Sequence, residues 1–266
     1  MVAAIAILSA KFYELMILIF IVLIHEMGHA FAASFFSWRI KQVLLLPFGG
    51  VLEVEEYGNK PIKEELIVTL AGPIQHGWLL LAGLFFHQMN LLSDDLYTTF
   101  VEFNIMILIF NCLPILPLDG GKLILLLFSK ILPFQQAMQR AIIVSFVFLM
   151  IYMCALLIIS PYHLNGWIIV IFLLFSLYNE WKNRPFVFIR YLIDKYTRQS
   201  KLGQMKKINV MSYNSLSEVV EKFHRGVSHT IIVKDSNEKK HIPEAELLKS
   251  YFENNPMQVK IRDLLF

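Results

Sequence analysis

The sequence predicts an α-helical polytopic membrane protein with five to six transmembrane segments, a membrane-associated β-hairpin or re-entrant loop, and a small C-terminal α+β domain. Of the 266 residues, 56% are hydrophobic and only 17% are charged, a balance that soluble globular proteins seldom reach. Long apolar segments fill the first part of the chain, and the last part has the mixed composition of a soluble domain. The net charge of +3 is too small to indicate nucleic-acid binding.

Five apolar segments have the length of about 20 residues that a helix needs to cross a bilayer of about 30 Å. A shorter run, Val2–Ala10, either packs at an interface or belongs to a first helix whose beginning is absent. The five long segments are Phe12–Phe36, Glu65–Met89, Tyr97–Leu116 running on through Leu132, Ala141–Ser160 and Leu164–Trp181.

Basic residues collect after the last apolar segment. Between residues 182 and 207 the sequence has many lysines and arginines and a single acid, Asp194. Because such residues are enriched in cytoplasmic segments beside transmembrane helices, this stretch and the chain after it are predicted to be cytoplasmic. The basic side chains also suit contact with the anionic headgroups of membrane lipids.

These changes in composition predict a transmembrane domain (residues 1–181), a basic interdomain linker (182–206) and a C-terminal domain (207–266). In the C-terminal domain, β-prone runs and helix-like stretches follow in the order β-α-β-β-α. Between the first two long apolar segments, Ile40–Glu56 has two short β-prone runs around a proline and two glycines. This pattern is typical of a hairpin, which we expect at the membrane edge.

The residues HEMGH lie within the first long apolar segment, with His25 and His29 four positions apart and Glu26 beside the first. Positions i and i+4 share one face of a helix, so both imidazoles can bind the same metal ion while Glu26 reaches a water molecule there. Alternatively, the two histidines are hydrogen-bonded to neighbouring carbonyl groups. Since ionisable groups in a membrane span are costly, three within five residues favour a functional site.

A catalytic zinc ion needs a third protein ligand, and Asp119 is the best candidate. It lies in NCLPILPLDGG (Asn111–Gly121), where prolines and glycines interrupt the third long apolar segment. Such a break frees backbone groups to line a polar cavity and lets a carboxylate point inward. The alternative is that Asp119 only caps the helix that follows.

The two motifs together resemble the site-2 protease family of intramembrane zinc metalloproteases. The resemblance implies one Zn²⁺ per chain, held by His25, His29 and Asp119, with Glu26 as the catalytic base. The flanking stretches AGPIQH and LPILPLDGGKL resemble those family members that process a pro-sigma factor of the pro-sigma-K type during sporulation. That substrate would place the chain in the mother-cell membrane around the forespore, with inhibitory or regulatory membrane proteins of the sporulation complex as partners.

The resemblance extends to residues 207–266, which are similar to cystathionine-β-synthase-type (CBS-type) modules. It implies a homo-oligomer formed through these modules and ATP as a ligand there. A substrate-docking or purely structural domain is the alternative.

A helical substrate must unwind before cleavage, so we expect an extended substrate to add as a strand to the predicted hairpin. Asn111 is a second candidate for holding the substrate backbone, and a helix–helix hydrogen bond is its alternative role. We expect His76 and His87, on the second long segment, to be packed or interfacial rather than metal ligands. The hairpin residues expected to bind the substrate are Val43, Leu44, Leu45 and Leu46.

Two other functions fit parts of the pattern. A site-2 protease could act on a transmembrane anti-sigma factor instead. A non-proteolytic metal transporter or sensor would use the same histidines and aspartate, but it would need no general base. Glu26 therefore discriminates between proteolysis and transport.

Overall fold

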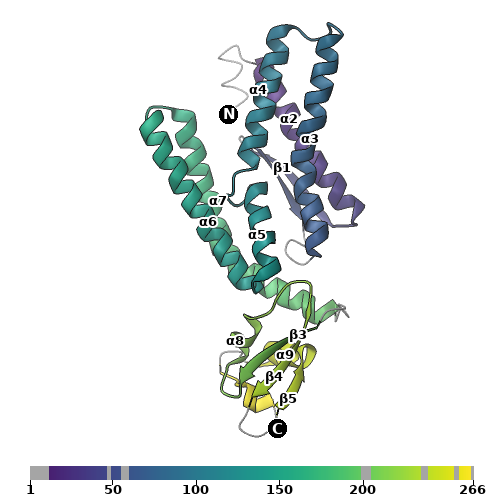
Figure 1. Cartoon of the computed structure of the whole chain (residues 1–266), viewed down its shortest axis with the longest axis vertical. Helices are drawn as coiled ribbons and strands as arrows, with labels where there is room; N and C mark the ends of the chain where they lie inside the picture. The colour runs from purple at the N-terminus through teal and green to yellow at the C-terminus, as the bar shows by residue number, and fades with distance from the viewer. Residues whose placement is uncertain are drawn as a thin grey trace. The chain divides into compact units, whose positions relative to one another are not determined.

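The computed structural model describes residues 12–46, 49–54, 60–198, 205–234, 239–254 and 258–264. The chain divides into two compact units, which are described separately (Figure 1). Unit 1 comprises Met1–Ile124 and Val144–Tyr178, and unit 2 comprises Leu125–Ile143 and Asn179–Phe266. The predicted short segment Val2–Ala10 lies outside the described residues.

Three helices form the centre of unit 1: α2 (Phe12–Phe35), α3 (Ile62–Gln88) and α4 (Asp94–Asn111). Their apolar side chains interlock in a small core that includes Ile21, Val22, Leu79 and Ile107. Many other large apolar side chains of these helices are exposed, as expected for surfaces that face lipid.

Among the described residues, four helices are long and apolar enough to cross a membrane, against the five to six predicted. They are α2, α3, α6 (Phe134–Ile159) and most of α7 (Leu164–Arg198). The predicted third segment is instead two helices, α4 and α5 (Asp119–Ile131). Helix α4 has only 18 residues and carries Asp94, Asp95 and Glu102, so it has less apolar length than the other spans.

The predicted hairpin is present as the antiparallel pair β1 (Ile40–Leu46) and β2 (Gly49–Val54). Val43 is paired with Leu52 and Leu46 with Gly49. Both strands contact α2, so the hairpin packs on the helix that carries the HEMGH motif. The depth of the hairpin in a membrane stays a prediction.

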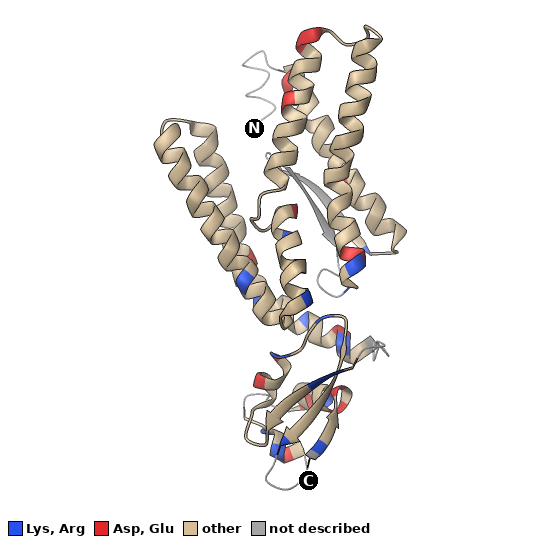
Figure 2. Ribbon diagram, in the orientation of Figure 1, with Lys and Arg blue, Asp and Glu red and all other residues tan. Residues whose placement is uncertain are grey.

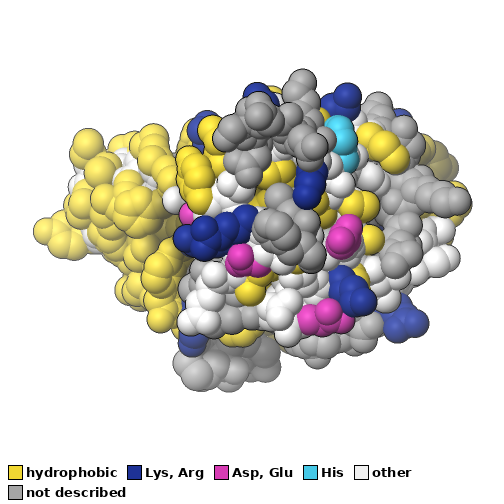
Figure 3. Space-filling model, turned by 90° about the horizontal axis from the view of Figure 1, so that it is seen from below, with side chains coloured by type: hydrophobic (Ala, Val, Ile, Leu, Met, Phe, Trp, Pro, Cys, Tyr) yellow, Lys and Arg dark blue, Asp and Glu magenta, His cyan; other side chains and the backbone are white. Residues whose placement is uncertain are grey.

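Unit 2 has a three-stranded sheet in the order β3-β4-β5, with β3 parallel to β4 and β5 antiparallel to it. The elements follow in the predicted order, and the assignment as a CBS-type module stays a prediction. Basic and acidic side chains are mixed on the face seen in Figure 3. The elements are β3 (Met205–Met211), α8 (Leu216–Val220), β4 (Ser228–Lys234), β5 (Lys239–Pro243), α9 (Glu244–Glu253) and η1 (Ile261–Leu264).

Residues before position 207 also belong to the core of unit 2. Helix α7 runs through the first part of the predicted linker to Arg198, and Lys and Arg positions, coloured blue on the ribbon, lie along this end of it (Figure 2). Tyr191 and Leu192 from α7 and Phe134 from α6 are buried against the sheet and its helices. The domain boundaries at 181/182 and 206/207 stay predictions.

Candidate metal centre

His25 and His29 lie one turn apart on the buried face of α2, and their Nε2 atoms are 3.1 Å apart. The residues between and beside them allow a close approach of α3. A Cβ atom at Gly28 would lie 2.6 Å from the carbonyl oxygen of Ala71, so only glycine lets the two helices pack at this distance. Both imidazoles are thus held inside unit 1.

Asp119 reaches the same point from α5, 90 positions after His29. Its Oδ2 atom lies 3.0 Å from Nε2 of His29 and 3.2 Å from Nε2 of His25. The chain turns back sharply just before α5 and brings Gly120 close to Cys112. A Cβ atom at Gly120 would lie 2.3 Å from the carbonyl oxygen of Cys112, so glycine is needed at this position. The break in the predicted third segment therefore delivers the carboxylate to the histidine pair.

The three donor atoms fit a tetrahedral zinc ion. They form a triangle with edges of 3.0, 3.1 and 3.2 Å, and zinc bonds of about 2.0 Å in a tetrahedron imply ligand separations of about 3.3 Å. Nδ1 of His29 is 2.7 Å from the carbonyl oxygen of Val68, which can only accept a hydrogen bond. A neutral His29 therefore carries its proton on Nδ1 and directs the Nε2 lone pair at the other two donors.

Glu26 is buried beside the three donors without joining their triangle. Its Oε1 atom is 4.0 Å from Nε2 of His25, too long for a direct hydrogen bond and suitable for contact through one water molecule. The described side chains of His25, Glu26 and His29 form a group that could hold a metal ion, with ligand atoms within 4.8 Å of one another.

Lys122 contacts the other side of the Asp119 carboxylate. Its Nζ atom is 3.2 Å from Oδ1 of Asp119, one turn further along α5. The two oxygens of Asp119 are thereby distinguished, because Oδ2 faces the imidazoles and Oδ1 faces the ammonium group. Neither end of this ion pair is fully exposed.

Two residues outside the predicted site lie directly behind His25. Nε2 of His76, on α3, is 3.0 Å from Nδ1 of His25. Asn104, on α4, contacts the other ring nitrogen of His76 through its Oδ1 atom. His76 is therefore a buried neighbour of a candidate ligand and not a packing residue alone. Gly72 and His76 are four positions apart on α3 and share a helix face. This spacing is the feature of the sequence that indicates that His76 faces the histidine pair.

Gly72 leaves the space that the imidazoles occupy. A Cβ atom there would lie 2.3 Å from Nε2 of His29 and 2.8 Å from Cε1 of His25. The absence of a side chain at Gly72 thus makes room for both imidazoles.

The substrate-binding residues stay predictions. The side-chain amide of Asn111 donates a hydrogen bond to the carbonyl oxygen of Ile107, one turn earlier in its own helix, 3.1 Å away. The backbone of Val43, Leu44, Leu45 and Leu46 forms most of β1.

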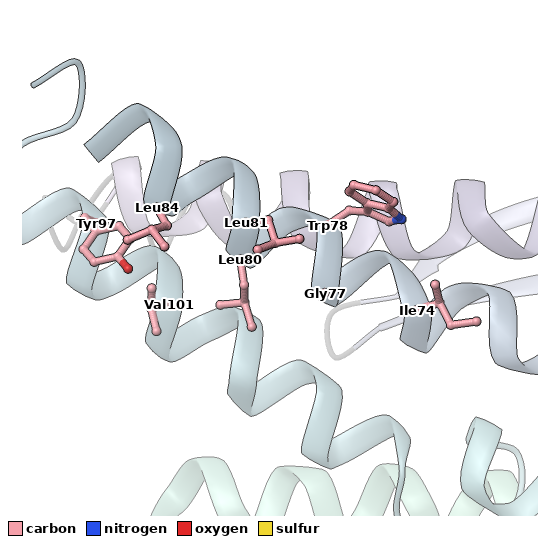
Figure 4. A pocket seen from close by; sticks show the side chains of 8 residues that line it. All are labelled: Ile74, Gly77, Trp78, Leu80, Leu81, Leu84, Tyr97 and Val101. Atoms are coloured by element: carbon pink, nitrogen blue, oxygen red, sulfur yellow. The ribbon is translucent and has the colours of Figure 1, made fainter. Parts of the chain in front are cut away.

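A separate apolar groove of about 630 Å³ runs along α3 and α4. Gly77, Trp78, Leu81, Tyr97 and Val101 are among its lining residues (Figure 4). None of the candidate site residues lines this groove, so the two features are distinct.

The chain is similar in sequence to known proteins. Residues 13–93, which include the HEMGH motif, match the model of peptidase family M50. The chain is 40% identical over 266 residues to stage IV sporulation protein FB of Bacillus subtilis, covering 99% of this chain and 92% of that protein. A zinc metalloprotease of Methanocaldococcus jannaschii is 35% identical over 120 residues, covering 44% of this chain and 34% of that protein.

The fold is similar to that of a solved structure. The site-2 protease from Methanocaldococcus jannaschii superimposes with a TM-score of 0.55 at 23% identity, covering 66% of this chain and 82% of that one. This likeness concerns the fold, and the sequence match across nearly the whole chain carries the assignment. The chain therefore belongs to peptidase family M50, the site-2 protease family, and is an intramembrane zinc metalloprotease.

Proposed function

We propose that this protease cleaves a membrane-associated pro-sigma factor of the pro-sigma-K type during sporulation and so releases the active sigma factor. Two findings support the proposal. The donor atoms of His25, His29 and Asp119 converge to within 3.2 Å of one another, with Glu26 beside them. The match to a stage IV sporulation protein extends over 99% of the chain, so the likeness is not confined to the peptidase motifs.

In this proposal His25, His29 and Asp119 hold the zinc ion, and Glu26 is the general base. Zinc, when bound, acidifies a water molecule and polarises the carbonyl group of the scissile peptide bond. The carboxylate of Glu26 takes the proton of the attacking water and then gives it to the leaving nitrogen, so the group is regenerated in each cycle.

The apolar surroundings have a role in this chemistry. Helices α2, α3 and α5 bury the four side chains within unit 1, where charge–charge interactions are stronger than in water. At the same time the broken chain before α5 places polar groups at the depth of a span. The peptidase site can therefore meet a membrane-associated substrate without exposing its ionisable groups to lipid.

We further propose that an extended substrate adds to β1 at Val43–Leu46, on the edge opposite the one that pairs with β2. A proline in this strand removes a backbone N–H donor, and N–H groups of successive residues point to opposite edges. Single prolines across the four positions should lower cleavage about tenfold or more at the positions whose N–H groups face the substrate. Unchanged cleavage at all four positions would remove strand addition as the binding mode.

The substrate is tested by co-expressing the chain with a candidate pro-sigma factor and measuring the shortened product. We expect cleavage by the wild type and at least a hundredfold slower cleavage by Glu26→Gln, since a general base contributes about 10²–10⁴ to the rate. The purified variant should retain zinc, because Glu26 is outside the donor triangle. A wild type that leaves the pro-sigma factor intact but cleaves a transmembrane anti-sigma factor would overturn the proposed substrate.

A further inference from the structure

We propose that Asn104 and His76 are positioning residues, which fix the tautomer of His25 so that its Nε2 lone pair points into the metal centre. The inference rests on the proposed zinc ligands and goes beyond them. It assigns a task to two buried polar side chains of α3 and α4 that touch no substrate. Their contacts determine where each proton lies, one residue at a time.

The amide of Asn104 has a fixed orientation. Its Nδ2 atom donates a hydrogen bond to the backbone carbonyl oxygen of His76, 3.1 Å away. A carbonyl oxygen can only accept, so the amide nitrogen must be the atom that faces it. The Oδ1 atom of Asn104 therefore faces Nδ1 of His76, and it can only accept there. Asn104 is completely buried, so water does not compete for these bonds.

The orientation of the amide determines the state of His76. Because Oδ1 of Asn104 accepts, Nδ1 of His76 must carry a proton. In the neutral imidazole the other nitrogen, Nε2, then has a lone pair and no proton. That lone pair lies 3.0 Å from Nδ1 of His25, which must donate to it. A neutral His25 with its proton on Nδ1 has a bare Nε2 atom, as a zinc ligand requires.

His29 also carries its proton on Nδ1, and a single hydrogen bond fixes that tautomer. Its Nδ1 atom donates directly to the carbonyl oxygen of Val68, 2.7 Å away. The two zinc-binding imidazoles are thus oriented by different devices, one backbone carbonyl for His29 and a two-residue relay for His25. Only the relay depends on side chains, so only the relay can be removed by substitution.

Two amides at position 76 separate the relay from simple packing. In His76→Gln, the side-chain Nε2 can donate to Asn104 and the Oε1 can accept from His25, so the relay is preserved. The shorter side chain of His76→Asn can contact Asn104 but falls short of His25. The full-length variants, purified in detergent and stripped of metal, would be titrated with Zn²⁺ against a chromophoric chelator.

We expect His76→Asn to bind zinc at least tenfold more weakly than the wild type, as for other outer-shell partners of zinc ligands, whose loss costs about 10–100-fold. His76→Gln should remain within about threefold of the wild type. The visible absorption bands of the cobalt-substituted chain should be alike in the wild type and His76→Gln and should differ in His76→Asn, because the ligand arrangement changes only there.

Equal zinc affinities of the two variants, whether both unchanged or both reduced, would overturn the relay. The wild type distinguishes this failure from a failure of the proposed function. If the wild type binds one zinc ion but substitutions at position 76 do not change the zinc affinity, the proposed metal site is retained and the relay is rejected. If the wild type binds no zinc, the proposed metal site and the relay are both rejected.

Discussion

Asp119 uses its two carboxylate oxygens on different partners. Oδ2 faces the imidazoles of His25 and His29, and Oδ1 is 3.2 Å from the ammonium group of Lys122. A carboxylate with one oxygen held by a cation cannot rotate freely, so it presents the other oxygen to the site in a single orientation. Lys122 thereby acts on the metal centre through its contact with Asp119.

Replacing the cation tests this arrangement. Lys122→Met retains most of the apolar length of the side chain and removes the charge. We expect it to weaken zinc binding about tenfold, because outer-shell partners orient the ligands that they contact. Lys122→Arg keeps a cation within reach and is the matched control, with an affinity near that of the wild type. The measurement is competition with a chelator, and an unchanged affinity of the methionine variant would contradict the orienting role.

The residues of the centre differ in how far the sequence predicts them. The sequence predicts His25 and His29 because two histidines four apart share a helix face. It predicts Glu26 and Asp119 because ionisable groups stand out within apolar segments. A single histidine such as His76 has no such spacing. Its contact with His25 depends on how α3 packs against α2, which hydropathy does not encode.

At the scale of elements, the third apolar segment shows why a hydropathy pattern overestimates continuity. The residues from Tyr97 to Leu132 are apolar almost throughout, so the pattern predicts one long segment. The structure has α4 and α5 instead, with a non-helical connection between them that contains Pro114 and Pro117. The sequence indicated a break, but the fold-back that brings Asp119 to the histidines is set by contacts distant in the chain.

Helix α3 offers two glycines with opposite surroundings. A Cβ atom at Gly72 would lie 2.3 Å from Nε2 of His29. Among the described residues, a Cβ atom at Gly77 would meet no atom within 4 Å beyond the nearby backbone of its own helix. Gly72→Ala should therefore displace the imidazoles and lower both zinc affinity and proteolysis at least tenfold. Gly77→Ala should leave zinc binding unchanged and stabilise the chain by about 0.5–1 kcal/mol, because alanine is the better helix former.

The two alanine variants are compared by zinc titration and by thermal unfolding in the same detergent. Both add one methyl group to the same helix, so a general effect of alanine would appear in both. Normal zinc affinity in Gly72→Ala would show that the imidazoles do not depend on this close approach.

At the scale of the molecule, composition predicts the C-terminal domain but not all the residues that form its core. The sequence changes character near residue 207, and the sheet of unit 2 begins close to that point, at Met205. Phe134, Tyr191 and Leu192 belong to the same core although they come from α6 and α7. In the sequence, Phe134 lies between two predicted apolar segments, and Tyr191 and Leu192 lie in the basic stretch. Only tertiary packing reveals that all three belong to this core.

A buried polar cluster links α7 to the sheet within unit 2. Nζ of Lys195 is 2.6 Å from Oε1 of Glu244, whose Oε2 atom is 2.9 Å from Nδ1 of His229. The backbone N–H of His224 donates to Nε2 of His229, 3.0 Å away. His229 therefore holds its proton on Nδ1 and accepts at Nε2, so a second proton would have to replace the hydrogen bond from His224.

This cluster makes the stability of unit 2 depend on pH. Burial lowers the pKa of His229 below its usual value of 6.5, against the opposing effect of Glu244. Burial favours the neutral form of Glu244, but the hydrogen bond from His229 and the charge of Lys195 outweigh it and hold the Glu244 pKa below 4.5. Both groups bind fewer protons in the folded state than in the unfolded state, so the free energy of unfolding falls as the pH falls.

The loss should begin below about pH 6.5 through His229 and continue below about pH 4.5 through Glu244, with about 1.4 kcal/mol for each unit by which a folded pKa is lowered. Hydrogen exchange of the β4 amides in the full-length chain, corrected for the intrinsic pH dependence of exchange, measures this stability between pH 7 and pH 4.

The control is His229→Gln, whose side chain at position 229 does not titrate. The stability of this variant should vary less between pH 7 and pH 5 than that of the wild type. The histidine at position 224, whose pKa burial also lowers, contributes a remaining slope of the same sign in both proteins. If protection of β4 in the wild type rose as the pH fell from 7 to 5, or if His229→Gln showed the same pH dependence as the wild type, the buried imidazole would not be the group that couples protonation to the folding of this unit.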